Sequence, residues 1–134
     1  MEYFQYIAQA TNLLNAIQCF EFTFHLYLMK MVWGITNNLS QALLRKDQDI
    51  VNAMNLVKFS KHRLQKMRDE GWESLLGEVF LFCDKHHIIV PNMLDLFVIR
   101  GRSRLNVEES TNLHHYRVEV FYVVIDMQLQ ELNK

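Results

Sequence analysis

In the stretch from Leu39 to Met67, apolar residues repeat with the period of an α-helix. No other feature of the sequence restricts the possible folds as strongly. A helix turns once in about 3.6 residues, so apolar residues mostly three, four or seven apart gather on one face. The stretch therefore predicts a long amphipathic element that needs partner helices to cover it. Its apolar positions are Leu39, Leu43, Ile50, Ala53, Met54, Val57, Leu64 and Met67.

The segments on either side supply such partners. Apolar residues also repeat with helical spacing over Tyr3–Ile17 and over Trp72–His86. Gly71 lies between the central stretch and the second of these segments. We expect it to end a helix, because glycine readily adopts the left-handed conformation that closes helices.

Polar residues predict where the central helices begin. Asn38 is expected to cap a helix that opens at Leu39. The apolar pattern is interrupted near residues 46–47, so Asp47 or Asp49 is expected to cap a second helix. The stretch is thus interpreted as two helices.

Two segments fit both a strand and a helix. Alternating apolar residues over Phe20–Ile35 match a strand, but the same residues form a helical face and the length favours helix, with a kink or stop at Gly34. The β-branched residues of 116–126 favour a strand by propensity. A helical face is also present there, formed by Tyr116, Val120, Phe121, Val124, Gln128 and Leu132.

The periodic pattern disappears between residues 87 and 110, where Pro91 and Gly101 indicate a loop. The predicted fold is therefore all-α: an irregular bundle of five or six helices with one long loop around residues 87–110. Residues 1–134 are interpreted as a single helical domain or as a fragment of a larger one.

Composition excludes several classes of partner. The net charge of −1 gives the whole chain no attraction to nucleic acid or to anionic membranes, so such contact needs a local basic patch. The longest apolar run, Phe20–Trp33, contains charged residues and is too short to span a bilayer. The N-terminus has no basic region typical of a signal peptide. We expect an intracellular protein with no membrane partner, in which Cys19 and Cys83 are buried free thiols.

One set of residues resembles a zinc site. Cys83 and His86 are spaced as a pair of ligands, and a second histidine pair lies at His114 and His115. Adjacent histidines of a helix point about 100° apart, and a second cysteine pair is missing. We favour the simpler interpretation that His86 and His87 follow a helix C-terminus, where the helix dipole favours them. No cofactor is expected.

The acidic residues do not form a catalytic motif. None of them lies in a motif that would shift its pKa, and the chain has no glycine-rich phosphate loop or serine nucleophile elbow. We expect no enzyme activity and no small-molecule substrate. The residues considered are Asp47, Asp49, Glu108, Glu109 and Asp126.

The one basic cluster is formed by Arg100, Arg102 and Arg104 in the predicted loop. Three arginines on a loop can contact phosphates or serve as a weak nuclear-import signal. A solvated loop without a ligand is the alternative. These three residues are the candidate nucleic-acid-binding site.

The segment Leu39–Met54 resembles hAT-superfamily transposases, with the closest likeness to domesticated plant proteins of the zinc-finger MYM-type or TTF-type. The matching pattern is a Leu-Ser-x-x-Leu helix end, a short polar connector and an Asp-Ile-x-x-Ala helix start. Further matching segments are 20–35, 65–72, 86–91, 100–104 and 114–132.

The resemblance implies the helical insertion of an RNase H-like domain, with the catalytic acids outside this chain and Asp126 in a structural role. It also implies helices at 20–35 and 116–132 and a nuclear location. The expected function is a non-catalytic remnant of a hAT-type transposase that assists DNA or protein contacts, with Arg100, Arg102 and Arg104 as the DNA contacts. The alternative is a helical protein-interaction module without DNA binding, which includes self-association; the near-zero net charge favours it.

Overall fold

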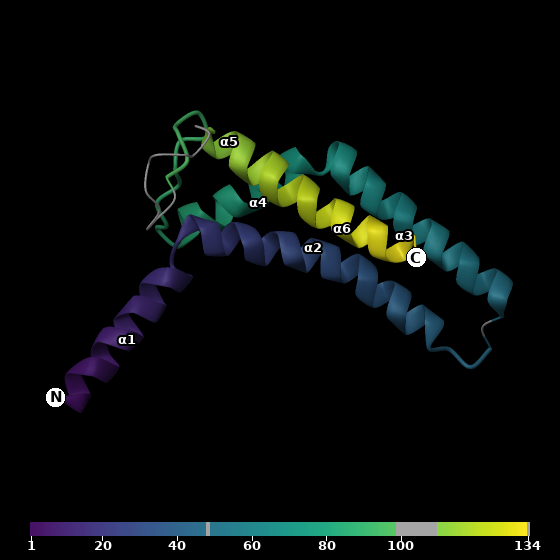
Figure 1. Ribbon diagram of the computed structural model, residues 1–134, viewed down its shortest axis with the longest axis horizontal. Coiled ribbons are helices and arrows are strands. Elements are labelled where there is room, and N and C mark those ends of the chain that lie inside the picture. Colours follow the sequence, from purple (N-terminus) through teal and green to yellow (C-terminus); the bar gives the residue numbers. More distant parts are fainter. Residues whose placement is uncertain (48, 99–109, 134) are drawn as a thin grey trace.

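The computed structural model describes residues 1–47, 49–98 and 110–133, which form a helical bundle (Figure 1). The described residues contain five helices if the last three elements are counted as one continuous helix, and they contain no strand beyond one isolated bridge. The predicted all-α class is confirmed. The elements are α1 (Glu2–Ile17), α2 (Phe20–Leu43), α3 (Ile50–Glu70), α4 (Trp72–Lys85), α5 (Asn112–His114), the π-helical η2 (His115–Tyr122) and α6 (Val123–Leu132).

The bundle is built on a long hairpin of α2 and α3. The continuous helix from α5 to α6 lies beside this hairpin, and α4 packs against α2 at the end where α2 begins (Figure 1). The C-terminal end of α6 stops short of the α2–α3 turn (Figure 1). Helix α1 projects away from the other helices. Only part of the α2–α3 hairpin is therefore covered by other helices.

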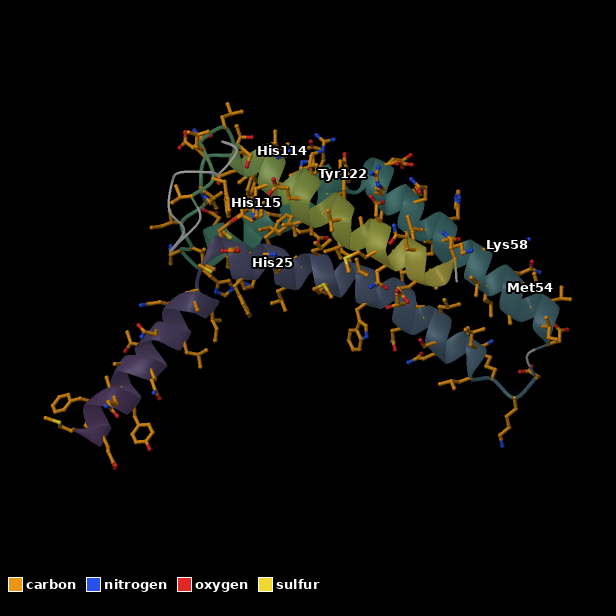
Figure 2. All side chains as sticks on the ribbon, viewed as in Figure 1. His25, Met54, Lys58, His114, His115 and Tyr122 are labelled. Carbon is orange, nitrogen blue, oxygen red and sulfur yellow. The ribbon has the colours of Figure 1, made fainter. Side chains whose placement is uncertain are left out.

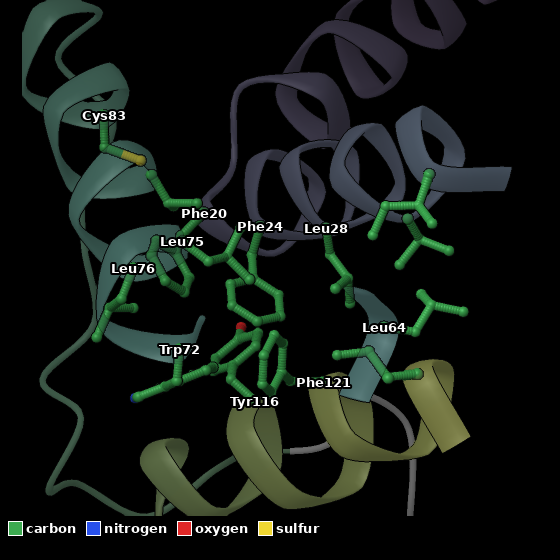
Figure 3. Close-up of a cluster of buried hydrophobic side chains, with 14 residues drawn as sticks. Phe20, Phe24, Leu28, Leu64, Trp72, Leu75, Leu76, Cys83, Tyr116 and Phe121 are labelled. Atoms are coloured by element: carbon green, nitrogen blue, oxygen red, sulfur yellow. The ribbon is translucent and has the colours of Figure 1, made fainter. Parts of the chain in front are cut away.

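Aromatic side chains form the centre of the core (Figure 3). Phe24 lies with its ring centroid 5.0 Å from that of Tyr116 and 5.8 Å from that of Trp72. Trp72 in turn packs against Phe121 at 5.4 Å. Burial raises the pKa of Tyr116 to about 12, because a phenolate would lose its hydration among these rings. The cluster joins α2, α4 and the last helix into one unit.

The last helix buries a face that overlaps the predicted one at Tyr116 and Phe121 but is shifted toward Asn112 and Ile125. Its buried residues are Asn112, Tyr116, Phe121 and Ile125, in steps of four, five and four. A step of five suits the π-helical hydrogen-bonding pattern, in which each turn contains more residues than in an α-helix. Ile125, outside the predicted stripe, is buried, whereas Val120 is only partly buried. The π-helical turn lets both Tyr116 and Phe121 reach the core.

Helix α2 is continuous, so a stop at Gly34, one of the two predicted alternatives, and the predicted cap at Asn38 are wrong. A glycine in a helix interior costs only about 1 kcal/mol. Buried residues continue on both sides of Gly34, from Val32 through Ile35 to Leu39. Burial of this unbroken stripe outweighs the local signals to stop.

The predicted break after α2 is confirmed. The carboxylate of Asp49 caps α3, accepting a hydrogen bond of 2.7 Å from the backbone N–H of Asn52. Gly71 ends α3 as expected, but the proposed reason is wrong, because its φ of −88° and ψ of −8° are right-handed. The same residue precedes Trp72 and directly begins α4.

The described part of the predicted loop, residues 87–98, contains no helix and is held against the start of the last helix. The N–H of Phe97 donates to the carbonyl of Ser110 over 2.8 Å. The N–H of Asn112 donates to the carbonyl of Asp95 over 2.8 Å. This segment is therefore anchored at the point where the last helix begins.

Candidate functional site

The predicted nucleic-acid-binding residues Arg100, Arg102 and Arg104 lie outside the described residues. Their assignment stays a prediction. Glu108 and Glu109 also lie outside the described residues, and the structure assigns a position to each of the other candidates.

The zinc interpretation, which the sequence disfavoured, gains no support. Cys83 is fully buried in the core, and burial raises the pKa of its thiol, an effect that a hydrogen bond with Thr23 partly opposes. His86 follows the end of α4 and lies with its ring centroid 4.3 Å from that of Phe82. In the part of the chain that the structure describes, no three potential ligands come together around a possible metal position.

The histidine pair of the last helix has a structural role instead. His115 Nδ1 lies 3.0 Å from a carboxylate oxygen of Glu119, and His114 Nδ1 lies 3.6 Å from the other oxygen. The His115 ring stacks on Phe97, with centroids 3.6 Å apart and planes at 11°. Figure 2 shows both histidines at the end of the bundle opposite to Met54. Through its contact with Phe97, His115 helps attach the 87–98 segment to the bundle.

The cysteine prediction is half wrong. Both thiols are free, but only Cys83 is buried, while Cys19 is partly exposed. The sulfur of Cys19 accepts a hydrogen bond of 3.4 Å from the N–H of Phe22. Cys19 is thus the N-cap of α2, a role that explains its exposure at the junction with α1.

The acidic residues also have structural positions. Asp126 forms an ion pair of 2.7 Å with Arg68 and joins α6 to α3. The hydrogen bond from Arg68 to Asp126 is the main cause that raises the pKa of Arg68. Both side chains are partly exposed, so the pair contributes at most about 1 kcal/mol. Asp49 is the α3 cap, Asp47 lies in the preceding exposed turn, and Glu108 and Glu109 lie outside the described residues.

Helix α1 carries an apolar face that the other described residues leave uncovered. Its large residues on this face are exposed by 44% to 73%, and no residue of α1 is buried. The opposite face points toward the bundle. Asn12 and Asn15 line an open concavity of about 1160 Å³ together with the start of α2 and Phe97. The apolar face consists of Tyr3, Tyr6, Ile7, Ala10, Leu13, Leu14 and Ile17.

The turn of the α2–α3 hairpin is a second apolar surface. We expected neighbouring helices to cover the stripe of residues 39–67, and this is wrong at the turn. Leu44 is 81% exposed and Ile50 is 79% exposed. The cause is the length of the last helix, which stops short of this end (Figure 1). The exposed residues are Leu43, Leu44, Ile50, Val51 and Met54.

A third surface is cationic. Residues 58–68 of α3 contain lysine and arginine but no acidic residue. Lys58 projects from the outer side of α3 in Figure 2. A groove of about 520 Å³ between α3 and Ile35 is lined by Arg63 and Lys66, and the guanidinium of Arg63 lies 5.9 Å from the ring of Phe59. Sequence inspection missed this surface because its charges are spread along a helix. The cations of this surface are Lys58, Lys61, Arg63 and Lys66, whereas Arg68 at the end of the segment is paired with Asp126.

These features define the class of this protein: it is an all-α bundle with exposed apolar and cationic helix surfaces. No protein-family model, curated protein or solved structure matches this chain. The resemblance to hAT-superfamily transposases therefore stays a prediction that rests on the matching segments alone. Within residues 1–47, 49–98 and 110–133, no helix is both long and apolar enough to cross a membrane.

Proposed function

We propose that this protein is a non-catalytic helical interaction module that binds other protein chains through exposed apolar helix surfaces. The main support for this proposal is that the apolar face of α1 is exposed along its whole length. Contiguous exposed apolar surfaces of this kind are typical of sites where another protein docks. The structural roles of Asp49, Cys83, His115 and Asp126 support a role in binding rather than in catalysis.

Site-specific photo-crosslinking in cells tests this function. A photoreactive phenylalanine analogue at Tyr6 is expected to capture discrete protein bands, because this side chain is 68% exposed on the α1 face. The matched control carries the analogue at Gln5, on the opposite, polar face of the same helix. Equal labelling from both positions, or no discrete band from Tyr6, would contradict the proposal.

A second candidate function is DNA contact by a hAT-type transposase remnant located in the nucleus. The cationic surface of α3 favours it, because phosphate contacts provide most of the affinity of non-specific DNA binding. Arg100, Arg102 and Arg104 are the residues that the sequence resemblance proposes for the same task. In this candidate function the protein assists DNA contacts and has no strand-transfer activity.

DNA binding at low salt separates the two candidates. If the remnant binds DNA, changing Arg100, Arg102 and Arg104 together to alanine should weaken duplex binding. The logarithm of the binding constant falls linearly with the logarithm of the salt concentration, and this slope should become less steep by about 0.9 for each lost phosphate contact. Changing Lys58, Lys61 and Lys66 to alanine tests the α3 surface in the same way.

The matched control removes the same charge elsewhere, by changing Arg45, Lys46 and Lys85 to alanine. Fluorescence anisotropy with a labelled duplex measures all four proteins. DNA contact is ruled out as the function if no salt-sensitive binding occurs, and the arginine assignment is wrong if its variant binds as the parent protein does.

A further inference from the structure

Helix α1 has the residue pattern of a core helix and the position of a surface helix. The residues of its apolar face occupy three of every seven positions, as in helices that face the core of a bundle. None of them is buried in the described structure. An isolated helix of 16 residues is only marginally stable in water. A partner that covers this face would stabilise the helix.

The charge of α1 indicates what kind of partner fits. Glu2 is its only charged residue, and it lies at the extreme N-terminal end. Apart from Glu2 and Thr11, the polar residues beside and opposite the apolar face are uncharged amides, which both donate and accept hydrogen bonds. Such a face has no charge pattern that selects a chain of different sequence, and it does not repel an identical copy. These amides are Gln5, Gln9, Asn12 and Asn15.

The area of the face is also sufficient for a pair. Two tyrosines exposed by about 70% and four half-exposed aliphatic side chains present roughly 500 Å² per copy. Two copies would bury about 1000 Å² in total, which is the lower limit for a specific interface. The expected association is weak and depends on protein concentration.

We propose that the apolar face of α1 packs against the same face of α1 in a second copy of this chain, in antiparallel orientation. This proposal rests on the proposed function and names the partner. An antiparallel pair places the small Ala10 at the symmetry axis, where the two backbones approach most closely. It also sets Tyr6 of one copy against Leu14 of the other. A parallel pair would instead crowd the tyrosines of both copies at one end. Because α1 projects from the bundle, the antiparallel pair keeps the two bundles at opposite ends (Figure 1).

Sedimentation equilibrium of the full chain over a range of concentrations tests the pair. We expect a monomer–dimer equilibrium that weakens on the order of 100-fold when Tyr6 and Leu13 are both changed to glutamate, because like charges would then face each other. The control changes Gln5 and Asn12 to glutamate, which adds the same charge on the opposite face. Because α1 contributes no buried residue, thermal unfolding of the bundle should stay unchanged in both variants.

Disulfide formation tests the orientation. In a Cys19→Ser background, which keeps a capping side chain, Ala10→Cys is expected to give a covalent dimer under mild oxidation. Tyr3→Cys should not, because the two copies of residue 3 lie at opposite ends of an antiparallel pair. Cross-linking through Tyr3→Cys but not Ala10→Cys would overturn the orientation.

The proposed α1 pair is wrong if the chain is monomeric at all concentrations. It is also wrong if the variant with Tyr6 and Leu13 both changed to glutamate still forms the dimer. The photo-crosslinking experiment distinguishes this failure from failure of the proposed function. A Tyr6 cross-link to a different protein would leave the interaction module intact and remove only the second copy as the partner. The absence of any cross-link would remove both.

Discussion

Phe121→Ala is expected to lower the free energy of unfolding by about 3–5 kcal/mol, which is the range for removing a large aromatic side chain from a packed core. The Phe121 ring is fully buried and packs against Trp72. The π-helical turn positions this ring, so a cavity here also removes the packing that favours that turn. Loss of this ring therefore weakens the contact of the last helix with α2 and α4.

The matched control is Met127→Ala on α6, a side chain that is 59% exposed. It should change the free energy of unfolding by less than about 0.5 kcal/mol. Urea unfolding followed by far-ultraviolet circular dichroism measures both variants. Since small domains are stable by only about 5–15 kcal/mol, Phe121→Leu provides a milder variant if alanine prevents folding. Equal effects of Phe121→Ala and Met127→Ala would contradict the assigned core.

Gly71→Ala is expected to destabilise the protein by about 1–3 kcal/mol, in the range for forcing atoms into a packed position. A Cβ atom at residue 71 would lie 2.5 Å from the carbonyl oxygen of Met67. That oxygen accepts a hydrogen bond from the Gly71 N–H, so it cannot move away without disturbing the end of α3. Trp72 follows directly and is buried, which restricts movement on the other side.

Two other glycines provide controls, because their replacement by alanine should raise the free energy of unfolding rather than lower it. A Cβ atom at Gly34 or Gly77 would meet no atom within 4 Å, and both residues lie inside helices. Changing either one to alanine should stabilise the protein by about 0.5–1 kcal/mol, because alanine loses less conformational freedom on folding. The same urea titrations measure these variants. A stabilising effect of Gly71→Ala would show that the tight junction between α3 and α4 is not required.

The proposed surfaces lie on separate elements, so each can be tested without disturbing the others. The α1 face and the cationic residues of α3 share no residue, and neither contains the buried aromatic cluster. A loss of self-association with unchanged DNA binding, or the reverse, would therefore assign each activity to one surface.

The sequence alone determined the helical class and several helix boundaries. Helical spacing of apolar residues predicts helices because it depends on local geometry, and the structure confirms those predicted over Tyr3–Ile17 and Trp72–His86 to within a residue. A cap for α3 was also predictable as Asp47 or Asp49, since an acidic side chain next to the start of a helix interacts with nearby backbone groups, and the structure selects Asp49. The all-α fold could thus be predicted without tertiary information.

Only the tertiary structure decided which apolar faces are covered. Spacing predicts a stripe on α1 and another over residues 39–67, but coverage depends on how far distant helices reach. The last helix ends before the hairpin turn, and α1 projects from the bundle, so both surfaces stay exposed (Figure 1). The π-helical turn and the continuity of α2 through Gly34 likewise reflect burial against distant residues. Local sequence cannot specify these features, because their stabilisation comes from contacts between segments far apart in the chain.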